Sequence, residues 1–147
     1  MTGLDGLYQQ VILDHSKRRT GDSVLEPFDA EHFERNPSCG DEITLRLRLS
    51  PDGGRIEAIG WQGDGCSISM ASASVLAELA PGRTVEDARK MVAAFRELLR
   101  SRGAVVPDDD DLLGDAIAFE GVGKFVMRVK CAMLSWVALE AALLKAE

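Results

Sequence analysis

The stretch ITLRLRLSPDGGRIEAIGWQ, residues 43–62, decides the fold class. Apolar and polar residues alternate strictly from Ile43 to Leu49, which is typical of a strand with one buried face and one solvent-facing side. The Pro-Asp-Gly-Gly sequence at 51–54 predicts a turn, after which residues 55–62 return as a second strand. The sequence therefore predicts an antiparallel hairpin.

Helical patterns surround this hairpin on both sides. Apolar residues at helical spacing predict an amphipathic helix over residues 4–16 and another from residue 67 to the Pro-Gly stop at 81–82. A Thr followed three residues later by Asp resembles a capping box and predicts a helix over 84–101. Residues 132–145 are apolar and rich in alanine, so we expect a packed C-terminal helix there.

Two stretches carry weaker patterns. Residues 27–37 are expected to be irregular, with a short strand near Phe33, and residues 104–130 are expected to be rich in loops. The acidic run at 108–111 fits a solvated loop and a helix start better than a metal site. With no internal repeat or linker, residues 1–147 predict a single domain of the α+β class, with a small antiparallel sheet of about three strands packed against several helices.

Composition excludes several classes of function. Seventeen basic and 24 acidic residues give a net charge of −7, which argues against binding of nucleic acid because phosphate contacts need clustered basic residues. No stretch is apolar and long enough to predict a membrane span, and the first ten residues show no export signal, so we expect a cytoplasmic protein with no membrane partner. Three cysteines is an odd number, which does not suit a disulfide framework in a reducing compartment.

Each cysteine lies where the chain is expected to change structure. Cys39 directly precedes the hairpin, whereas Cys66 and Cys131 are each expected to begin a helix. A thiol at a helix N-terminus lies at the positive end of the helix dipole, which favours the thiolate form. Thiolates are needed both for zinc binding and for persulfide chemistry.

Asp41 follows Cys39 by two residues at the expected start of a strand, so the two side chains should project to the same side. Its carboxylate could supply the fourth, oxygen ligand of a tetrahedral zinc site. The chain has no Cys-x-x-Cys motif, so such a site would have to be assembled from three distant segments. The residues alone therefore leave open whether the cysteines form one zinc site or are separate buried thiols.

The segments around these residues resemble the SufU-type zinc-dependent sulfurtransferases, within the IscU-like superfamily of scaffolds for iron–sulfur cluster assembly. The matching motifs occur in the order of the family and span nearly the whole chain. They are LYQQVILDH at 7–15, NPSCGD at 36–41, GDGCSISMASAS at 63–74 and RVKCA at 128–132.

The resemblance implies a zinc site with Cys39, Asp41, Cys66 and Cys131 as ligands. It also implies that Cys39 accepts persulfide sulfur from a PLP-dependent cysteine desulfurase of the SufS type, and that the sulfur passes on to a downstream Suf scaffold. In this family an arginine near the site, matched here by Arg128, helps to engage the desulfurase or balances the charge of the ligands.

Two other functions use the same ligand types. The chain could be a scaffold on which an Fe–S cluster is assembled, since clusters also bind to thiolates. Lys130 stands where IscU scaffolds carry a histidine ligand, and this favours sulfur transfer. A structural zinc module that binds a partner is the third reading.

The remaining histidines and the tryptophans are expected outside the site. His15 and His32 lie away from the cysteine segments in the sequence, so capping, surface or partner contacts are expected for them. Trp61 and Trp136 are expected in the core or at its edge.

Overall fold

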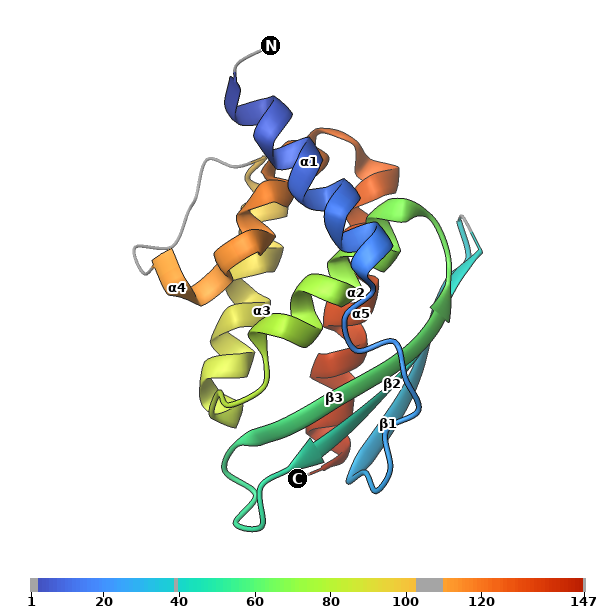
Figure 1. The fold of residues 1–147 in the computed structure, drawn as a ribbon, viewed down its shortest axis with the longest axis vertical. Helices are drawn as coiled ribbons and strands as arrows, with labels where there is room; N and C mark the ends of the chain where they lie inside the picture. The colour runs from blue at the N-terminus through green and yellow to red at the C-terminus, as the bar shows by residue number, and fades with distance from the viewer. Residues whose placement is uncertain (1–2, 39, 103–109, 147) are drawn as a thin grey trace.

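The computed structural model describes residues 3–38, 40–102 and 110–146. Three antiparallel strands form one sheet in the order β1-β2-β3 (Figure 1). The strands are β1 (Ala30–Asn36), β2 (Asp41–Leu49) and β3 (Ile56–Asp64). The predicted hairpin is confirmed as β2 and β3, and the predicted small antiparallel sheet is confirmed with β1 as its third strand.

The alternating pattern of β2 separates an apolar face from a polar one. Ile43, Leu45 and Leu47 are buried against the helices. On the other face, Arg46 donates a hydrogen bond of 2.7 Å to Glu31 on β1. Burial of the apolar face fixes the register of the sheet, because a shift by one residue would move these three apolar side chains into solvent.

Strand β1 is longer than the sequence predicted. An irregular segment over 27–37 was expected, with a short strand near Phe33, but β1 pairs with β2 over all seven of its residues. Its two ends, Ala30 and Asn36, are buried, whereas Phe33 is 53% exposed. The apolar side chain therefore lies on the solvent face of an edge strand, and no apolar alternation marks this strand in the sequence.

Helices cover one face of the sheet. They are α1 (Gly3–Arg18), α2 (Ser67–Leu79), α3 (Val85–Arg100), α4 (Asp110–Leu113), the 3-10 helix η1 (Gly114–Lys124) and α5 (Val126–Lys145). Helix α5 lies against β1 and β2, and α2 contacts both α5 and α1 (Figure 1). Within the described ranges, no helix combines the length and apolar character needed to cross a membrane. The predicted α+β class is confirmed.

Helices α1, α2 and α3 match the predicted helices with small shifts at their ends. The capping interaction predicted at the start of α3 is present, because the Thr84 side chain accepts a hydrogen bond of 3.0 Å from the backbone N–H of Asp87. Phe95 of α3 stacks on Trp136 of α5 with ring centroids 4.0 Å apart. Trp61 and Trp136 are both fully buried, as expected for core residues.

The prediction of loops over 104–130 was wrong for its described part. Helix α4 and the 3-10 helix η1 occupy much of it, and α5 begins at Val126 rather than near residue 132. Ala116, Phe119 and Val122 are buried at a spacing of three residues, which is the period of a 3-10 helix. A search for the period of 3.6 misses this pattern.

A buried serine joins α2 to α5. The Ser72 hydroxyl on α2 donates a hydrogen bond of 2.6 Å to the carbonyl oxygen of Ala132. It also accepts a hydrogen bond of 2.8 Å from the indole Nε1–H of Trp136. These bonds fix the contact between the two helices, on which Cys66 and Cys131 lie.

Candidate metal centre

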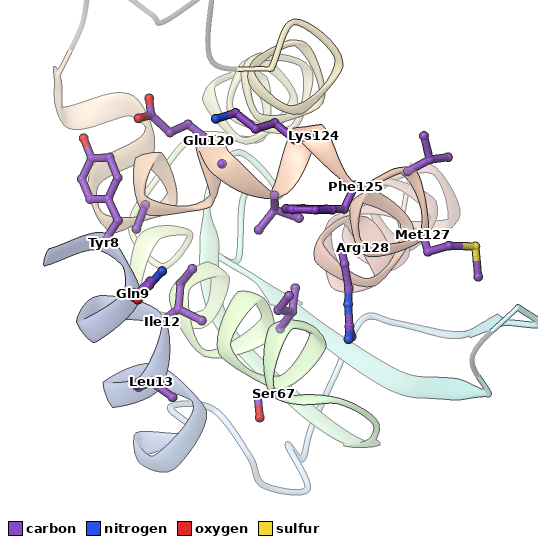
Figure 2. A pocket seen from close by; sticks show the side chains of 15 residues that line it. Tyr8, Gln9, Ile12, Leu13, Ser67, Glu120, Lys124, Phe125, Met127 and Arg128 are labelled. Atoms are coloured by element: carbon purple, nitrogen blue, oxygen red, sulfur yellow. The ribbon is translucent and has the colours of Figure 1, made fainter. Parts of the chain in front are cut away.

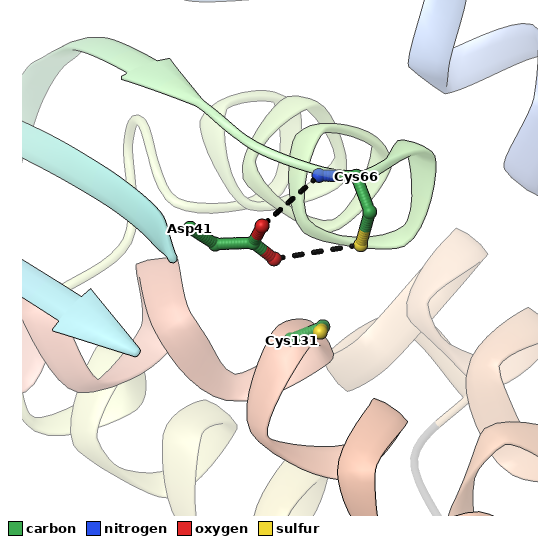
Figure 3. Close-up of side chains that lie close together, drawn as sticks. All are labelled: Asp41, Cys66 and Cys131. Atoms are coloured by element: carbon green, nitrogen blue, oxygen red, sulfur yellow. Dashed lines mark hydrogen bonds between the residues drawn. The ribbon is translucent and has the colours of Figure 1, made fainter. Parts of the chain in front are cut away.

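Cys66 is the N-cap residue of α2, so the prediction that it begins a helix is confirmed. Its backbone is extended, with φ −70° and ψ 167°, and its side chain makes no capping hydrogen bond within the described part of the chain. The cap comes instead from Asp41, whose Oδ1 accepts a hydrogen bond of 3.2 Å from the Cys66 N–H (Figure 3). A carboxylate at this end of the helix is stabilised by the helix dipole.

The Asp41 carboxylate lies in a buried position between β2 and α2. Asp41 is the first residue of β2 and is 4% exposed. Its Oδ2 lies 3.5 Å from the Cys66 Sγ and accepts a hydrogen bond from the Ser69 hydroxyl. Gly65 is required for this approach, because a Cβ at position 65 would lie 2.8 Å from the Asp41 Cγ.

Cys131 does not begin a helix, and that prediction was wrong. It is the sixth residue of α5, is 2% exposed, and its Sγ lies 3.6 Å from the carbonyl oxygen of Met127 one turn earlier. The helix-dipole argument therefore applies to Cys66 and not to Cys131. Its thiol instead faces the group formed by Asp41 and Cys66 (Figure 3).

Asp41, Cys66 and Cys131 form one group whose three ligand atoms lie within 4.8 Å of one another. They come from the start of a strand, the cap of one helix and the second turn of another (Figure 3). Two sulfurs and one carboxylate oxygen are donors that suit zinc, and three ligands leave one tetrahedral position for a fourth. The group could therefore hold a metal ion.

Cys39, the predicted fourth ligand, lies outside the described residues. Its neighbours in the sequence are described, and Asn36 connects them to the group. The Asn36 side-chain oxygen accepts a hydrogen bond of 3.1 Å from the Ser38 N–H, and its backbone oxygen accepts one of 2.8 Å from Gly40. The Asn36 side-chain nitrogen lies 4.0 Å from the Cys131 Sγ. Gly40 has a φ of +75°, which glycine adopts without strain.

Arg128 does not belong to the group of Asp41, Cys66 and Cys131. It is exposed on the first turn of α5 and extends towards the end of α2 that begins at Ser67 (Figure 2). The predicted arginine therefore lies on the surface, in the lining of a groove that also includes Ser67 at the start of α2.

A mostly apolar groove of about 1080 Å³ lies beside the site, between α1, α2, η1 and α5 (Figure 2). Phe125, Val126 and Met127 at the start of α5 line it and are 62%, 72% and 55% exposed. Tyr8 lines the opposite side, and both partial burial and the negative charge of Glu120 raise the pKa of its hydroxyl. The groove continues to the start of α2, directly after Cys66.

His15 is a core residue, and the prediction of a capping, surface or partner contact was wrong. It is 1% exposed, its Nδ1 lies 2.9 Å from the Ser74 hydroxyl, and its Nε2 lies 3.0 Å from the Asp115 carboxylate. The Glu78 Oε2 lies 3.9 Å from Nδ1, whereas Asp115 contacts Nε2. The two carboxylates face different ring nitrogens, and the cluster connects α1, α2 and η1.

Glu78 is held by two further residues. It accepts hydrogen bonds of 2.8 Å from Arg18 and 2.5 Å from Thr20. Burial alone would raise the pKa of Glu78, but these bonds and the nearby His15 hold that pKa below its usual value. The ionised carboxylate therefore stabilises the contact between α2 and the end of α1.

Two residues of the site had no predicted role. Ser69 and Asn36 both lie in the matched motifs, but neither was predicted to contact the ligands. The spacing of three residues from Cys66 to Ser69 was a usable signal, because residues three apart share one side of a helix. Asn36 had no such local signal, since it is 95 residues from Cys131.

Comparison with known families decides the relationship of the chain. The family model described as NifU-like N terminal domain matches residues 7–143. The chain belongs to this family. A relative from Bacillus subtilis, named zinc-dependent sulfurtransferase SufU, is 42% identical over 98% of this chain and 94% of its own length. A Streptococcus pyogenes relative, named iron-sulfur cluster assembly scaffold protein IscU, is 36% identical over 97% of this chain and 86% of its own length.

A solved structure gives the same picture for this member of the NifU-like family. The protein comes from Fervidobacterium islandicum AW-1 and is assigned as an iron-sulfur cluster assembly scaffold protein for the SUF system. It superposes with a TM-score of 0.82 at 34% sequence identity, covering 91% of this chain and 94% of that chain. The resemblance to SufU-type proteins and the predicted fold are thus both confirmed.

Proposed function

We propose that this protein is a zinc-dependent sulfur-transfer protein, which accepts persulfide sulfur from a cysteine desulfurase for iron–sulfur cluster assembly. The observation that carries the proposal is the convergence of Asp41, Cys66 and Cys131, whose ligand atoms lie within 4.8 Å of one another. The relatives named for zinc-dependent sulfur transfer and for cluster assembly support the same function.

The proposed ligands are Cys39, Asp41, Cys66 and Cys131. Bound zinc would keep the cysteine ligands deprotonated at neutral pH. The chain itself supplies a buried carboxylate at the cap of α2 and a thiol on each of two packed helices. Free thiols of this kind persist in a reducing compartment, so we place the protein in the cytoplasm.

The sulfur acceptor in this proposal is Cys39. Its thiolate attacks the outer sulfur of the desulfurase persulfide, so a new S–S bond forms on Cys39 while the S–S bond of the desulfurase breaks. The desulfurase cysteine leaves as a thiolate, and the negative charge is conserved. Cys39 follows Ser38 and precedes the positive-φ Gly40 in the sequence between β1 and β2, whereas Cys66 caps α2 and Cys131 lies within α5. A ligand in a connection can change position at lower cost than one on a packed helix.

The proposed partner is a SufS-type cysteine desulfurase, which would also contribute the PLP. Arg128 is available for this contact because it is exposed on the groove beside the site. Its guanidinium can bind a carboxylate on the partner through two parallel hydrogen bonds. The transferred sulfur would then pass to a downstream Suf scaffold.

Assembly of an Fe–S cluster on the same ligands is the second candidate function. It is favoured by the relatives named as scaffold proteins. Lys130 favours sulfur transfer, since it is an exposed cation directly before Cys131 and offers no ligand comparable to histidine.

The decisive experiment measures desulfurase turnover with cysteine, in the presence and absence of this protein purified in air. We expect a colourless protein with about one zinc per chain, and faster turnover when it is added. Cys66→Ser should lose both zinc and stimulation, while Ser135→Ala, a buried serine on the same helix as Cys131, should keep both. A brown protein containing iron and sulfide would favour the scaffold function, and a zinc protein without stimulation would contradict sulfur transfer.

A further inference from the structure

Ser69 touches both the carboxylate and one thiol of the candidate metal centre. It is the third residue of α2, is 1% exposed, and its hydroxyl donates a hydrogen bond to Asp41 Oδ2. The same hydroxyl oxygen lies 3.6 Å from the Cys66 Sγ. A serine at this position of a helix often bonds back to its own helix, but here the hydroxyl reaches a different segment of the chain.

We propose that Ser69 is a positioning residue that holds the Asp41 carboxylate in the orientation needed to bind the metal. This inference rests on the zinc site of the proposed function. Metal ligands in proteins are commonly held by hydrogen bonds from neighbouring side chains, and loss of such a neighbour weakens metal binding.

The two oxygens of Asp41 are fixed by different groups. Oδ1 accepts the Cys66 N–H at 3.2 Å, and Oδ2 accepts the Ser69 hydroxyl. Hydrogen bonds to both oxygens restrict rotation about the Cβ–Cγ bond and orient the plane of the carboxylate. A carboxylate oxygen has two lone pairs, so Oδ2 can accept the Ser69 hydroxyl and still face the cysteine sulfurs.

The hydrogen bond from Ser69 to Asp41 is buried, which makes its loss costly. Asp41 is 4% exposed, so water cannot readily replace a hydrogen bond that its carboxylate loses. Ser135 on α5 provides the comparison, because it is equally buried and its hydroxyl has no hydrogen-bond partner in the described part of the chain. Two buried serines near the site therefore differ in their contact with a ligand.

The test compares the zinc affinities of five proteins by competition with a chromophoric chelator. They are the wild type, Ser69→Ala, Asp41→Ala, the double variant of Ser69 and Asp41, and the control Ser135→Ala. Ser69→Ala should bind zinc about 10- to 100-fold more weakly than the wild type. If Ser69 acts through Asp41, adding Ser69→Ala to the Asp41→Ala variant should cause little further loss of zinc affinity. Ser135→Ala should match the wild type. Alanine has a high helix propensity, and circular dichroism of the metal-free variants checks that α2 still forms.

Cobalt(II) provides a second measurement, because its visible spectrum reports ligand number and type. Ser69→Ala should keep the thiolate-to-cobalt bands and shift the d–d bands, as expected when the carboxylate is displaced and the cysteines remain. Unchanged zinc affinity in Ser69→Ala together with a loss in Asp41→Ala would overturn the inference alone. Equal losses from Ser69→Ala with and without Asp41 would also overturn it. Unchanged affinity in Asp41→Ala would overturn both this inference and the proposed ligand set.

Discussion

Replacing Ser72 by alanine should weaken the contact between α2 and α5. The variant leaves the buried indole N–H of Trp136 without its acceptor, at a cost of about 1–3 kcal/mol. It also removes the hydrogen bond to the Ala132 carbonyl, a neutral pair that contributes roughly 1 kcal/mol. The better helix propensity of alanine offsets roughly 0.5 kcal/mol. We therefore expect a net loss of about 2.5 kcal/mol in the free energy of unfolding.

Urea denaturation of the metal-free protein measures this loss, and a thermal melt should show a decrease in Tm of roughly 5–10 °C. Ser135→Ala should be at least as stable as the wild type, because its hydroxyl is buried without a partner in the described part of the chain and alanine has the higher helix propensity. Trp136→Phe removes the indole N–H, so Ser72→Ala should cost less in that background. An equal cost with and without the indole, or a neutral Ser72→Ala, would refute the reasoning.

Three further predictions address the metal, the acceptor and pH. A strong chelator should lower the Tm and added zinc should restore it, because zinc at 100 times its Kd would stabilise the folded state by about 2.7 kcal/mol. An unchanged melt of protein shown to be metal-free would contradict a zinc site. After incubation with desulfurase and cysteine, mass spectrometry should find an added sulfur of about 32 Da on the Cys39 peptide, and Cys39→Ser should not acquire it; the label on the Cys131 peptide would reassign the acceptor. Glu78→Gln should lower stability at pH 7 by roughly 0.5–1 kcal/mol, since this side chain is 35% exposed. Because the pKa of Glu78 is lowered in the folded state, its contribution to stability is present above the usual carboxyl pKa and is lost as the pH falls through the folded-state pKa. The urea midpoints of the wild type and Glu78→Gln should therefore converge in acid. An equal difference between the two midpoints at pH 3 and pH 7 would argue against this ionisation.

The parts of the fold that the sequence predicted well are those encoded by local patterns. The alternation from Ile43 to Leu49 defines a strand without reference to the rest of the chain. The cap at Thr84 and the helix start at Cys66 likewise depend on residues close in sequence. The ligand group, in contrast, was predicted chiefly through the resemblance to a family, because spacing alone left separate thiols equally open.

The failures involve long-range contacts or unusual periods. His15 contacts Ser74 and Asp115, which are 59 and 100 residues away, so no local pattern shows that it is buried. The start of α5 was missed because Val126 and Met127 are exposed, and their apolar character does not mark a buried face. Cys131 therefore lies inside a helix that begins at Val126, six residues before the predicted start at residue 132.

The separation of the candidate ligands in the sequence determines when, during synthesis of the chain, the metal centre can form. Asp41 and Cys131 are 90 residues apart in the sequence, and α5 carries the second of them. At a synthesis rate of about 5–20 residues per second, the ribosome makes Cys131 roughly 5–18 s after Asp41. Until Cys131 is made, the nascent chain holds Asp41, and later also Cys66, without their partner on α5, so any metal captured then has an incomplete set of donors. A complete set of donors for the proposed zinc site therefore exists only after α5 has been synthesised, so correct loading of the proposed site follows that step.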